Sequence, residues 1–409
     1  MNIFEKIFCR VFQTGFKVAI PVMPYRQPVI IDGFENLPSI INKEKVHKGL
    51  LVTDQSIMKL GLTDGLQKIL KDNNIPLFIY DKTVPNPTTQ NVEDALSIYK
   101  ENNCDFIIGF GGGSSMDCAK ALGVRLAYPK KTLRQKGGIL KVLKPIPLLI
   151  AVPTTAGTGS ETTLASIIRD VETKEKYAIM SFPLIPRYAL LEPQITVSLP
   201  KHITSTTGMD ALTHAVEAFI GNSTTKKTRY YAKHAVNLIF KNLDTAVFTG
   251  DNIEARKNML EASFYAGCAF TVSYVGYVHA IAHSLGGEYN VPHGLANAVI
   301  LPMILKAYGH KIDKKLKALA IEAGLATSTT PQEEAAASFI RAIEEKNKSY
   351  GIGTTIPEIK AEDISRLAKH AAKEANPLYP VPILWNAKEL EHFYKELSPA
   401  DESRMKPDR

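Results

Sequence analysis

The sequence predicts a doubly wound α/β domain followed by an all-α domain. Short apolar runs alternate with helical stretches between residues 49 and 152, and glycine-rich turns follow two of these runs. After Pro200 the strand-like runs disappear, and helical periodicity continues to the C-terminus. We therefore expect an N-terminal segment over residues 1–29, an α/β domain over 30–199 and a helical domain over 200–409.

The strands of the α/β domain are predicted from continuous apolar runs, which are typical of parallel strands covered on both faces. These runs are residues 50–52, 77–80, 106–108 and 147–152. The intervening stretches 64–72 and 91–102 carry apolar residues at every third or fourth position, as amphipathic helices do. Because parallel neighbours need such crossovers, the order predicts a Rossmann-like parallel sheet with helices on both faces.

Length and composition describe an ordinary globular protein. The 409 residues are 45% hydrophobic and 22% charged, which is enough apolar material for more than one core. The formal charge of +8 is mild, and the densest basic stretch, residues 130–144, has few aromatic residues. We interpret that stretch as a solvated loop and do not expect nucleic acid as a partner.

Cysteine usage and hydropathy bear on location. The four cysteines are far apart and form no C-x-x-C pair, which indicates reduced thiols and a cytoplasmic protein. No uncharged apolar run approaches about 18 residues, so no transmembrane segment is expected.

The first residues predict an amphipathic helix, because apolar side chains recur there at helical spacing between charged ones. The apolar residues are Ile3, Phe4, Ile7, Phe8, Val11 and Phe12. Such a helix can lie on a membrane surface or serve as a signal sequence, although its charges and the missing small-residue cleavage site argue against a signal. We favour a helix docked on its own domain or on a sister subunit, with residues 21–28 as a linker.

A first glycine-rich turn, GFGGGSSMD at residues 109–117, follows a predicted strand and opens a helix. Glycine lets an anion approach the backbone closely, so the amides of Gly112 and Gly113 and the hydroxyl of Ser114 could hold a phosphate. The pattern G-x-G-x-x-G is not met, since Ser114 stands where the last glycine would be. A merely tight turn is therefore the alternative to a phosphate cradle.

Two further features of the α/β half favour a nucleotide. Asp54 ends the first of the long apolar strands, where its carboxylate could accept from a ribose hydroxyl and repel a 2′-phosphate. The alternative role for Asp54 is to cap the next helix. A second turn, PTTAGTGSE at residues 153–161, adds hydroxyls and helix-start amides after another strand.

Ligand-type side chains gather in three short pieces of the helical half. Asp210 and His214 are four residues apart, as are His279 and His283, and His293 follows in a Pro-His-Gly turn. A spacing of four places each pair on one helix face. Mostly apolar helices would hardly bury such groups without a metal, and one carboxylate with imidazoles suits Fe(II), Zn(II), Co(II) or Mn(II). The spacing does not separate ligands from neighbours.

Other features of the helical half are less informative. The helix that carries His279 and His283 is expected to end at Gly286-Gly287. Three nearby carboxylates form no recognisable acid–base pair and are given no role: Glu217, Glu261 and Glu288. The sequence contains no G-x-S-x-G, P-loop or H-E-x-x-H motif, so hydrolase, nucleotide triphosphatase and zincin functions lack support.

With these motifs the chain resembles the iron-containing, or group III, alcohol dehydrogenases, from about residue 30 to the C-terminal region. The resemblance rests on GGGS at 111–114, PTTAGTGSE at 153–161, GMDALTH at 208–214 and the two later histidine segments. It implies a dehydroquinate synthase-like architecture and a metal with four ligands: Asp210, His214, His279 and His293. It also implies that His283 lies near the substrate as the catalytic residue.

The resemblance further implies NAD(H) as cofactor. Asp54 would meet the adenosine ribose, which favours NAD over NADP, while Asn86 in a Pro-Asn-Pro turn and Lys176 would lie beside the cofactor. The remaining expected contacts come from the two glycine-rich turns: Gly112, Gly113, Ser114, Asp117, Thr154, Thr155, Thr158 and Ser160. The chain departs from the family in its longer N-terminal segment and in Glu192-Pro193, where Asp-Pro is common.

The implied function is a metal-dependent NAD(H) alcohol dehydrogenase or aldehyde reductase, with hydride transfer between a metal-bound small alcohol and C4 of the nicotinamide. Fe(II) is the favoured metal and Zn(II) the alternative, a small alcohol or aldehyde is the substrate, and a homodimer or higher homo-oligomer is expected. One rival is a glycerol dehydrogenase or dehydroquinate synthase-like enzyme on the same fold. The other is a non-catalytic assembly or membrane-associated protein stabilised by its metal.

Overall fold

The structure, a computed structural model, describes residues 1–399. The described chain forms two compact units. The first, here called the sheet unit, contains Pro24–Thr204 and Asn242–Thr271 and carries all the strands. The second, here called the helical unit, contains Met1–Met23, Ser205–Lys241 and the chain from Val272 onward.

The main sheet has six parallel strands in the order β1-β9-β6-β4-β2-β3. The strands are β1 (Val29–Asp32), β2 (Gly49–Val52), β3 (Leu77–Tyr80), β4 (Phe106–Gly111), β6 (Leu148–Pro153) and β9 (Tyr188–Leu191). The predicted parallel sheet is confirmed, and its four predicted strands are β2, β3, β4 and β6. Strands β1 and β9 were not predicted. Strand β1 is an edge strand with mostly exposed side chains and so lacks the continuous buried pattern, whereas β9 is buried throughout and could have been found by the same criterion.

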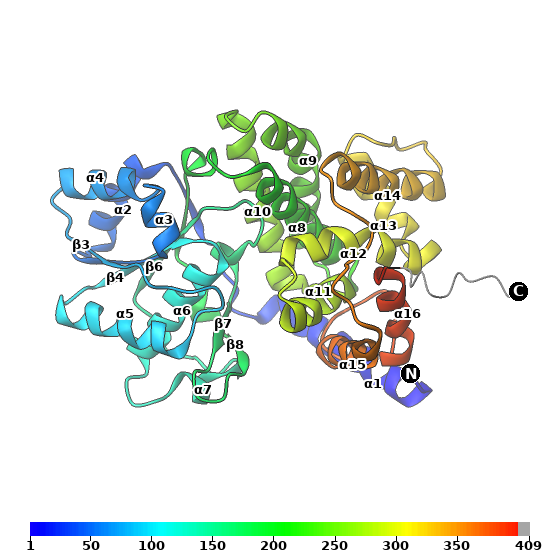
Figure 1. Ribbon diagram of the computed structural model, residues 1–409, viewed down its shortest axis with the longest axis horizontal. Coiled ribbons are helices and arrows are strands. Elements are labelled where there is room, and N and C mark those ends of the chain that lie inside the picture. Colours follow the sequence, from blue (N-terminus) through cyan, green and yellow to red (C-terminus); the bar gives the residue numbers. More distant parts are fainter. Residues whose placement is uncertain (400–409) are drawn as a thin grey trace, which may run out of the picture. The chain divides into compact units, whose positions relative to one another are not determined.

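The strand order places a topological switch point between β2 and β4. From β2 the chain moves outward to β3 and then returns past β2 to β4. The first connection runs through α3 (Gln55–Lys59) and α4 (Asp64–Asp72), and the second through α5 (Thr89–Glu101) on the opposite face (Figure 1). Doubly wound sheets bind ligands where the carboxyl ends of such strands diverge.

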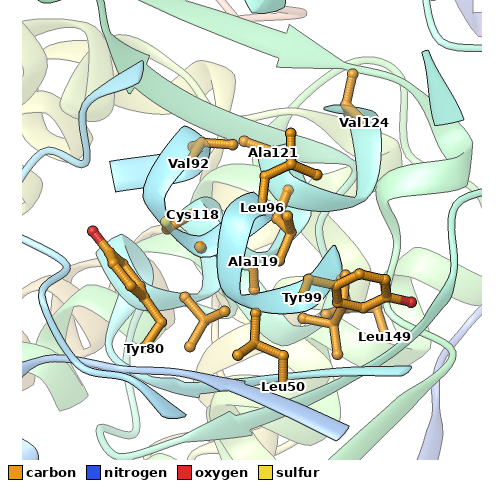
Figure 2. Close-up of a cluster of buried hydrophobic side chains, with 14 of the residues drawn as sticks. Leu50, Tyr80, Val92, Leu96, Tyr99, Cys118, Ala119, Ala121, Val124 and Leu149 are labelled. Carbon is orange, nitrogen blue, oxygen red and sulfur yellow. The ribbon is translucent and has the colours of Figure 1, made fainter. Parts of the chain in front are cut away.

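Two hydrophobic cores cover the two faces of this sheet. One contains Leu37 of α2 (Leu37–Glu44) and Leu66 of α4. The other packs α5 and α6 (Gly113–Ala127) over the strands, and Figure 2 shows Val92 and Ala119 of these helices above Leu50 of β2. Because both faces are buried, the strands are apolar throughout, which is why they could be predicted.

A smaller sheet accompanies α6 in the same unit. Its strands, in spatial order, are β5 (Gly138–Ile139), β8 (Lys176–Met180) and β7 (Ala165–Arg169). Strands β7 and β8 pair in an antiparallel manner, and β7 packs against α6. The stretch 130–144, expected to be a solvated loop, contains β5 and α7 (Leu133–Lys136); most of its basic side chains are exposed, while Leu133 and Val142 are buried.

From Lys201 the described chain is helical, as predicted. The helices are α8 (Lys201–Ile220), α9 (Lys226–Phe248), α10 (Ile253–Ser273), α11 (Tyr277–Tyr289), α12 (His293–Tyr308), α13 (Asp313–Glu322), α14 (Gln332–Ser349), α15 (Ile364–Ala375) and α16 (Ala387–Leu397). Helix α1 (Ile3–Ala19) confirms the helix predicted at the start of the chain. Short 3₁₀ helices lie at Ile20–Val22, Phe34–Asn36, Ser160–Thr162, Phe182–Leu184, Pro193–Thr196, Gly309–Lys311 and Ala361–Asp363. No helix among residues 1–399 has the length and apolar character needed to cross a bilayer.

The expected end of α11 at Gly286-Gly287 is wrong. The helix continues through both glycines to Tyr289 and ends at Asn290, whose φ is 56°. Asparagine adopts this left-handed conformation more readily than most residues. A glycine inside a helix is only about 1 kcal/mol less favourable than alanine, so the packing of α11 overrides the local signal.

Candidate metal centre and cofactor turns

Four ligand-type side chains converge within the helical unit. Asp210 and His214 lie one turn apart on α8, His279 lies on α11, and His293 is the first residue of α12. One ligand atom of each lies within 4.8 Å of the others. Asp210 Oδ1 is 3.9 Å from Nε2 of His279 and 3.6 Å from Nε2 of His293. Tetrahedral ligands about 2.1 Å from a metal would be roughly 3.4 Å apart, so this set fits one divalent cation.

Glycine lets the backbones that carry these groups approach closely. A Cβ on Gly294 would lie 2.5 Å from the carbonyl oxygen of Thr206, so the first turn of α12 touches the backbone of α8 directly. A Cβ on Gly276, just before α11, would lie 2.7 Å from Oε1 of Glu217. A larger residue at position 294 would push α12 away from α8, and one at position 276 would displace the carboxylate of Glu217.

Three of the four groups are sealed from solvent and the fourth is open. Asp210, His214 and His279 are at most 4% exposed, whereas the side chain of His293 is 40% exposed. Burial raises the pKa of Asp210 and, together with the neighbouring imidazoles, lowers the pKa of His279 well below its usual value. Neutral imidazole is the form that binds metal, and an open side is typical of a catalytic site.

Glu217, which the sequence analysis left without a role, orients His279. It lies one turn after His214 on α8, and its Oε2 is 2.6 Å from Nδ1 of His279. Its Oε1 accepts from the backbone N–H of Val278 at 2.8 Å. Burial raises the pKa of Glu217 to about 7. A carboxylate on Nδ1 fixes the proton there and leaves Nε2 facing the other ligand groups.

Asn297 is a second residue that the sequence analysis missed. It lies one turn after His293 on α12 and is fully buried. Its Nδ2 donates to Asp210 Oδ1 at 2.7 Å and is 3.2 and 3.0 Å from Nε2 of His279 and His293. Its Oδ1 has no hydrogen-bond partner within the described chain. The amide group of Asn297 therefore bridges ligand-type atoms from α8, α11 and α12.

His283 lies beside the four groups but outside their convergence. Its ring stacks on that of His293 at 5.2 Å between centroids. Its Nδ1 is 2.6 Å from Oε1 of Glu374, which also accepts from the hydroxyl of Tyr379 at 2.7 Å. Burial acts to lower the pKa of His283, but the carboxylate of Glu374 outweighs it and raises that pKa. The side chain is 44% exposed, so this imidazole can exchange protons with water.

In the sheet unit, the first glycine-rich turn joins β4 to α6. Gly111 has φ +146°, and a Cβ there would lie 2.7 Å from Oγ of Ser115, so glycine is required. Gly112 is the N-cap of α6 and gives no side-chain cap to the amides of the first turn. Nothing lies within 4 Å of the position of its missing Cβ. Uncapped amides with an open approach fit an anionic group such as a pyrophosphate.

Other predicted cofactor residues gather at the same edge of the sheet. The backbone N–H of Asn86 donates to Oγ of Ser114 at 3.3 Å. A Cβ on Gly113 would lie 3.9 Å from Cγ2 of Thr158, and the N–H of Thr154 donates to the carbonyl of Gly111 at 3.1 Å. The turns after β3, β4 and β6 therefore meet. The hydroxyl oxygen of the partly buried Thr155 is itself buried and has no hydrogen-bond partner among residues 1–399.

Asp54 serves as the helix cap that was the alternative to a ribose contact. Its Oδ1 accepts from the N–H groups of Ser56 and Ile57 at 2.9 and 3.1 Å. A Cβ on Gly111 would lie 2.9 Å from Cδ1 of Ile57, so this cap lies next to the first glycine-rich turn. The two roles are compatible, because a carboxylate has two oxygens with several acceptor positions.

The second glycine-rich turn is tied to α6 by Lys120. This lysine is fully buried, and its Nζ donates to the carbonyl and hydroxyl oxygens of Ser160 at 2.7 and 3.1 Å and to Oγ1 of Thr163 at 2.7 Å. The hydroxyl of Ser160 in turn donates to Oδ1 of Asp117 at 3.2 Å. Asp117 and Ser160, both expected to contact the cofactor, thus bind each other and hold the two turns together.

Lys176 lies further along the same unit. It begins β8 opposite Arg169 of β7, and the N–H of Arg169 donates to the carbonyl of Pro87 at 2.8 Å. Lys176 is therefore one strand away from the Pro-Asn-Pro turn. Its contact with a cofactor stays a prediction, as do the contacts assigned to the other residues of the turns.

A doubly wound sheet with anion-binding turns, combined with an Asp–His metal centre on helices, defines a class of metal- and nucleotide-binding oxidoreductases. Family comparison assigns the class. The chain belongs to the iron-containing alcohol dehydrogenase family: the model for "Iron-containing alcohol dehydrogenase" matches residues 31–193, and that for "Fe-containing alcohol dehydrogenase family, C-terminal" matches residues 204–398.

Individual relatives agree with this assignment. The chain is 37% identical to 1,3-propanediol dehydrogenase of Klebsiella pneumoniae over 353 residues, or 85% of this chain and 91% of that protein. It is 36% identical to NAD-dependent methanol dehydrogenase of Bacillus methanolicus, over 80% of this chain and 86% of that one. A crystal structure of 1,3-propanediol oxidoreductase matches with a TM-score of 0.87 and 35% identity, covering 91% and 99% of the two chains.

These findings confirm three predictions from the sequence: the family, the fold class and the assignment as an alcohol dehydrogenase. The family implies a metal and NAD(H). Helix α1 precedes both matched ranges.

Replacing Glu217 by Gln should weaken metal binding. The amide keeps the size of the side chain but removes the charge that holds the proton on Nδ1 of His279, and such supporting contacts typically contribute 10- to 100-fold in metal affinity. Competition with a metal-binding dye measures the change. The control is Glu288→Gln, which alters a surface pair with Arg366 and should leave affinity unchanged. Equal affinities for the two variants would contradict the role of Glu217.

Replacing Glu161 by Gln should remove a pH dependence of stability. Glu161 is 1% exposed, and burial raises its pKa to about 7 from an ordinary value of 4.5, against the opposing charge of Lys120. Between these pH values the unfolded chain releases the proton and the folded chain keeps it, so stability falls as pH rises. Glu161→Gln should gain on the order of 3 kcal/mol at pH 8 and little at pH 4.5.

Urea unfolding at both pH values measures this difference. The exposed Glu172→Gln serves as the matched control and should change stability by less than about 0.5 kcal/mol. A gain for Glu161→Gln that is the same at both pH values would show that ionisation of this carboxyl is not responsible.

Proposed function

We propose that this alcohol dehydrogenase interconverts small primary alcohols or diols and their aldehydes, with NAD(H) as hydride carrier and Fe(II) as the bound metal. The observation that carries the proposal is the set of one carboxylate and three imidazoles. The carboxylate and two of the imidazoles are buried, and the third imidazole is open to solvent. Two relatives are named as dehydrogenases of 1,3-propanediol and of methanol, which supports short alcohols as substrates.

The two halves of the chain take different tasks in this proposal. Residues 30–199 hold NAD(H), and residues 200–409 hold the metal and the substrate. Asp210, His214, His279 and His293 are the metal ligands, with Glu217 supporting His279. When bound, the divalent metal supplies Lewis-acid polarisation of the substrate oxygen.

The residues around the metal centre move the proton in this reaction. The Nδ1–H of His283 donates to Glu374, so this proton stays on the ring. The other ring nitrogen, Nε2, exchanges a proton with the substrate or with water. Tyr379 donates to the same carboxylate oxygen and holds it in place. In alcohol oxidation the proton leaves through His283, and in aldehyde reduction it returns by the same route.

The cofactor residues position the dinucleotide. The amides of Gly112 and Gly113 and the hydroxyl of Ser114 hold the pyrophosphate at the N-terminus of α6, with Thr154, Thr155 and Thr158 beside them. Asp54 binds the adenosine ribose and repels a 2′-phosphate. Asn86 and Lys176 lie beside the cofactor. Asp117 and Ser160 act through the bond between them, which keeps the two turns in register.

The setting of the enzyme is part of the proposal. A cytoplasmic location agrees with four buried cysteines that form no disulfide. A homodimer or higher homo-oligomer remains our expectation. Zn(II) suits the same ligand types, and the family description, which names iron, favours Fe(II).

Asp54→Asn should relax the preference for NAD. Asparagine caps a helix as well as aspartate does, so α3 and overall stability should be retained while the charge that repels a 2′-phosphate disappears. We expect kcat/KM for NADP to rise at least tenfold relative to that for NAD. Asp64→Asn, at the start of α4, is the control. An unchanged ratio would remove Asp54 from the ribose site.

Metal-free protein reloaded with Fe(II) or Zn(II) should form NADH only in the presence of an alcohol. The assay follows nicotinamide absorbance with methanol, ethanol, 1-propanol, 1,3-propanediol and glycerol, and with propanal in reverse. We expect 1-propanol and 1,3-propanediol to exceed glycerol at least tenfold, and His214→Ala to bind less metal and to be inactive. Activity confined to glycerol, or equal activity without metal, would contradict the proposal.

A further inference from the structure

Helix α1 is attached to the helical unit by a narrow face. Only Cys9 and Gln13 of this helix are buried. Gln13 Nε2 donates to the carbonyls of Tyr379 and Pro377 at 2.7 and 3.2 Å, and the guanidinium of Arg10 donates to the carbonyl of Val381 at 2.7 Å. Polar contacts to one loop therefore anchor the helix.

The apolar face of α1 points away from this attachment. At 100° per residue, the apolar side chains cover the half of the helix opposite Cys9 and Gln13. Their exposed fractions are 64% for Ile3, 80% for Phe4, 54% for Ile7, 60% for Phe8, 66% for Val11, 41% for Phe12 and 72% for Val18. The helix therefore docks on its own unit, which is one of the two placements that we expected, but its apolar stripe takes no part in those contacts.

The helix does not need its apolar face to form. Asn2 and Glu5 make a reciprocal capping box at its start, and the ring of Phe16 packs edge-on against Tyr274 at 5.0 Å near its end. The matched family ranges begin at residue 31, so α1 lies outside the part of the chain that the family models cover. An exposed apolar stripe of this kind indicates an interaction site for a partner outside this chain's own core.

Cations border the apolar stripe. Lys6 and Arg10 of α1 line a hollow together with Lys311. At the other end, Lys17 and Arg229 lie near enough to Lys315 for their charges to add to the effect of burial on its pKa. The acidic group of the helix, Glu5, is engaged in the capping box. The edge of the stripe is thus positively charged along the length of the helix.

We propose that α1 is an in-plane membrane anchor that docks the enzyme on an anionic lipid surface. The apolar stripe would enter the boundary between headgroups and acyl chains, and the bordering lysines would meet lipid phosphates. A second copy of the chain fits less well, because an antiparallel two-fold contact through this stripe would bring the same cationic border against itself. Lipid phosphates neutralise that border instead.

Flotation of the full-length, metal-loaded protein with vesicles tests the proposal. Vesicles of phosphatidylcholine alone are compared with vesicles containing 30% phosphatidylglycerol. We expect at least tenfold stronger binding to the anionic vesicles, weakened severalfold in 0.5 M NaCl. Phe4→Ser with Phe8→Ser should lose at least tenfold in binding, while Lys6→Gln with Lys17→Gln should lose only the preference for anionic lipid.

Leu143→Ser with Leu325→Ser is the matched control, since both side chains are exposed at sites outside α1. Its vesicle binding should stay within twofold of that of the unchanged protein. Alcohol-dependent NADH formation in solution should be the same for all variants, which verifies folding. Light scattering measures the oligomeric state and so tests the alternative that α1 joins two copies of the chain. If Phe4→Ser with Phe8→Ser splits a defined oligomer and the unchanged protein does not bind vesicles, α1 is a subunit contact and the proposal is overturned. Equal vesicle binding by that variant and its control also overturns it.

Discussion

The structure of the helical unit depends on the burial of one carboxylate among imidazoles. Asp210 is 2% exposed, and burial raises the pKa of its carboxyl. Leaving such a group in an apolar interior is unfavourable unless a cation or donors compensate it. The compensation explains the neighbours of Asp210. Imidazoles share the site, Glu217 contacts His279, and glycine at 294 lets α12 approach the backbone of α8.

A comparable constraint operates in the sheet unit, where two backbone turns must stay in register at the carboxyl edge. The ammonium group of Lys120 joins them by donating to backbone and hydroxyl oxygens of the second turn. Burial lowers its pKa, against the opposing charge of Asp117.

Much of the fold and of the metal centre follows from the sequence. Strands buried on both faces are apolar throughout, and ligand pairs four residues apart on a helix are visible without coordinates. The same reasoning could have found Glu217 and Asn297, because they continue the faces of His214 and His293 by three and four residues. Glu374 gives no such signal, since it lies 91 positions from the imidazole it contacts.

Spacing alone could not decide the orientation of side chains that share a face. His279 and His283 are equivalent by helical geometry, and only the approach of α8 and α12 distinguishes them. Amphipathicity likewise reveals that α1 has an apolar side but not which side docks. The packing at Cys9 and Gln13 decides that, through a loop more than 360 residues away.

X-ray absorption spectroscopy of the Fe(II)-loaded protein tests the central claim most directly. The account predicts one iron per chain, with scattering from three imidazole rings and a carboxylate oxygen at about 2.0–2.2 Å. A spectrum of His214→Ala protein should lose one imidazole. Sulfur ligation, or an imidazole count that this substitution does not change, would contradict the assignment of these four residues.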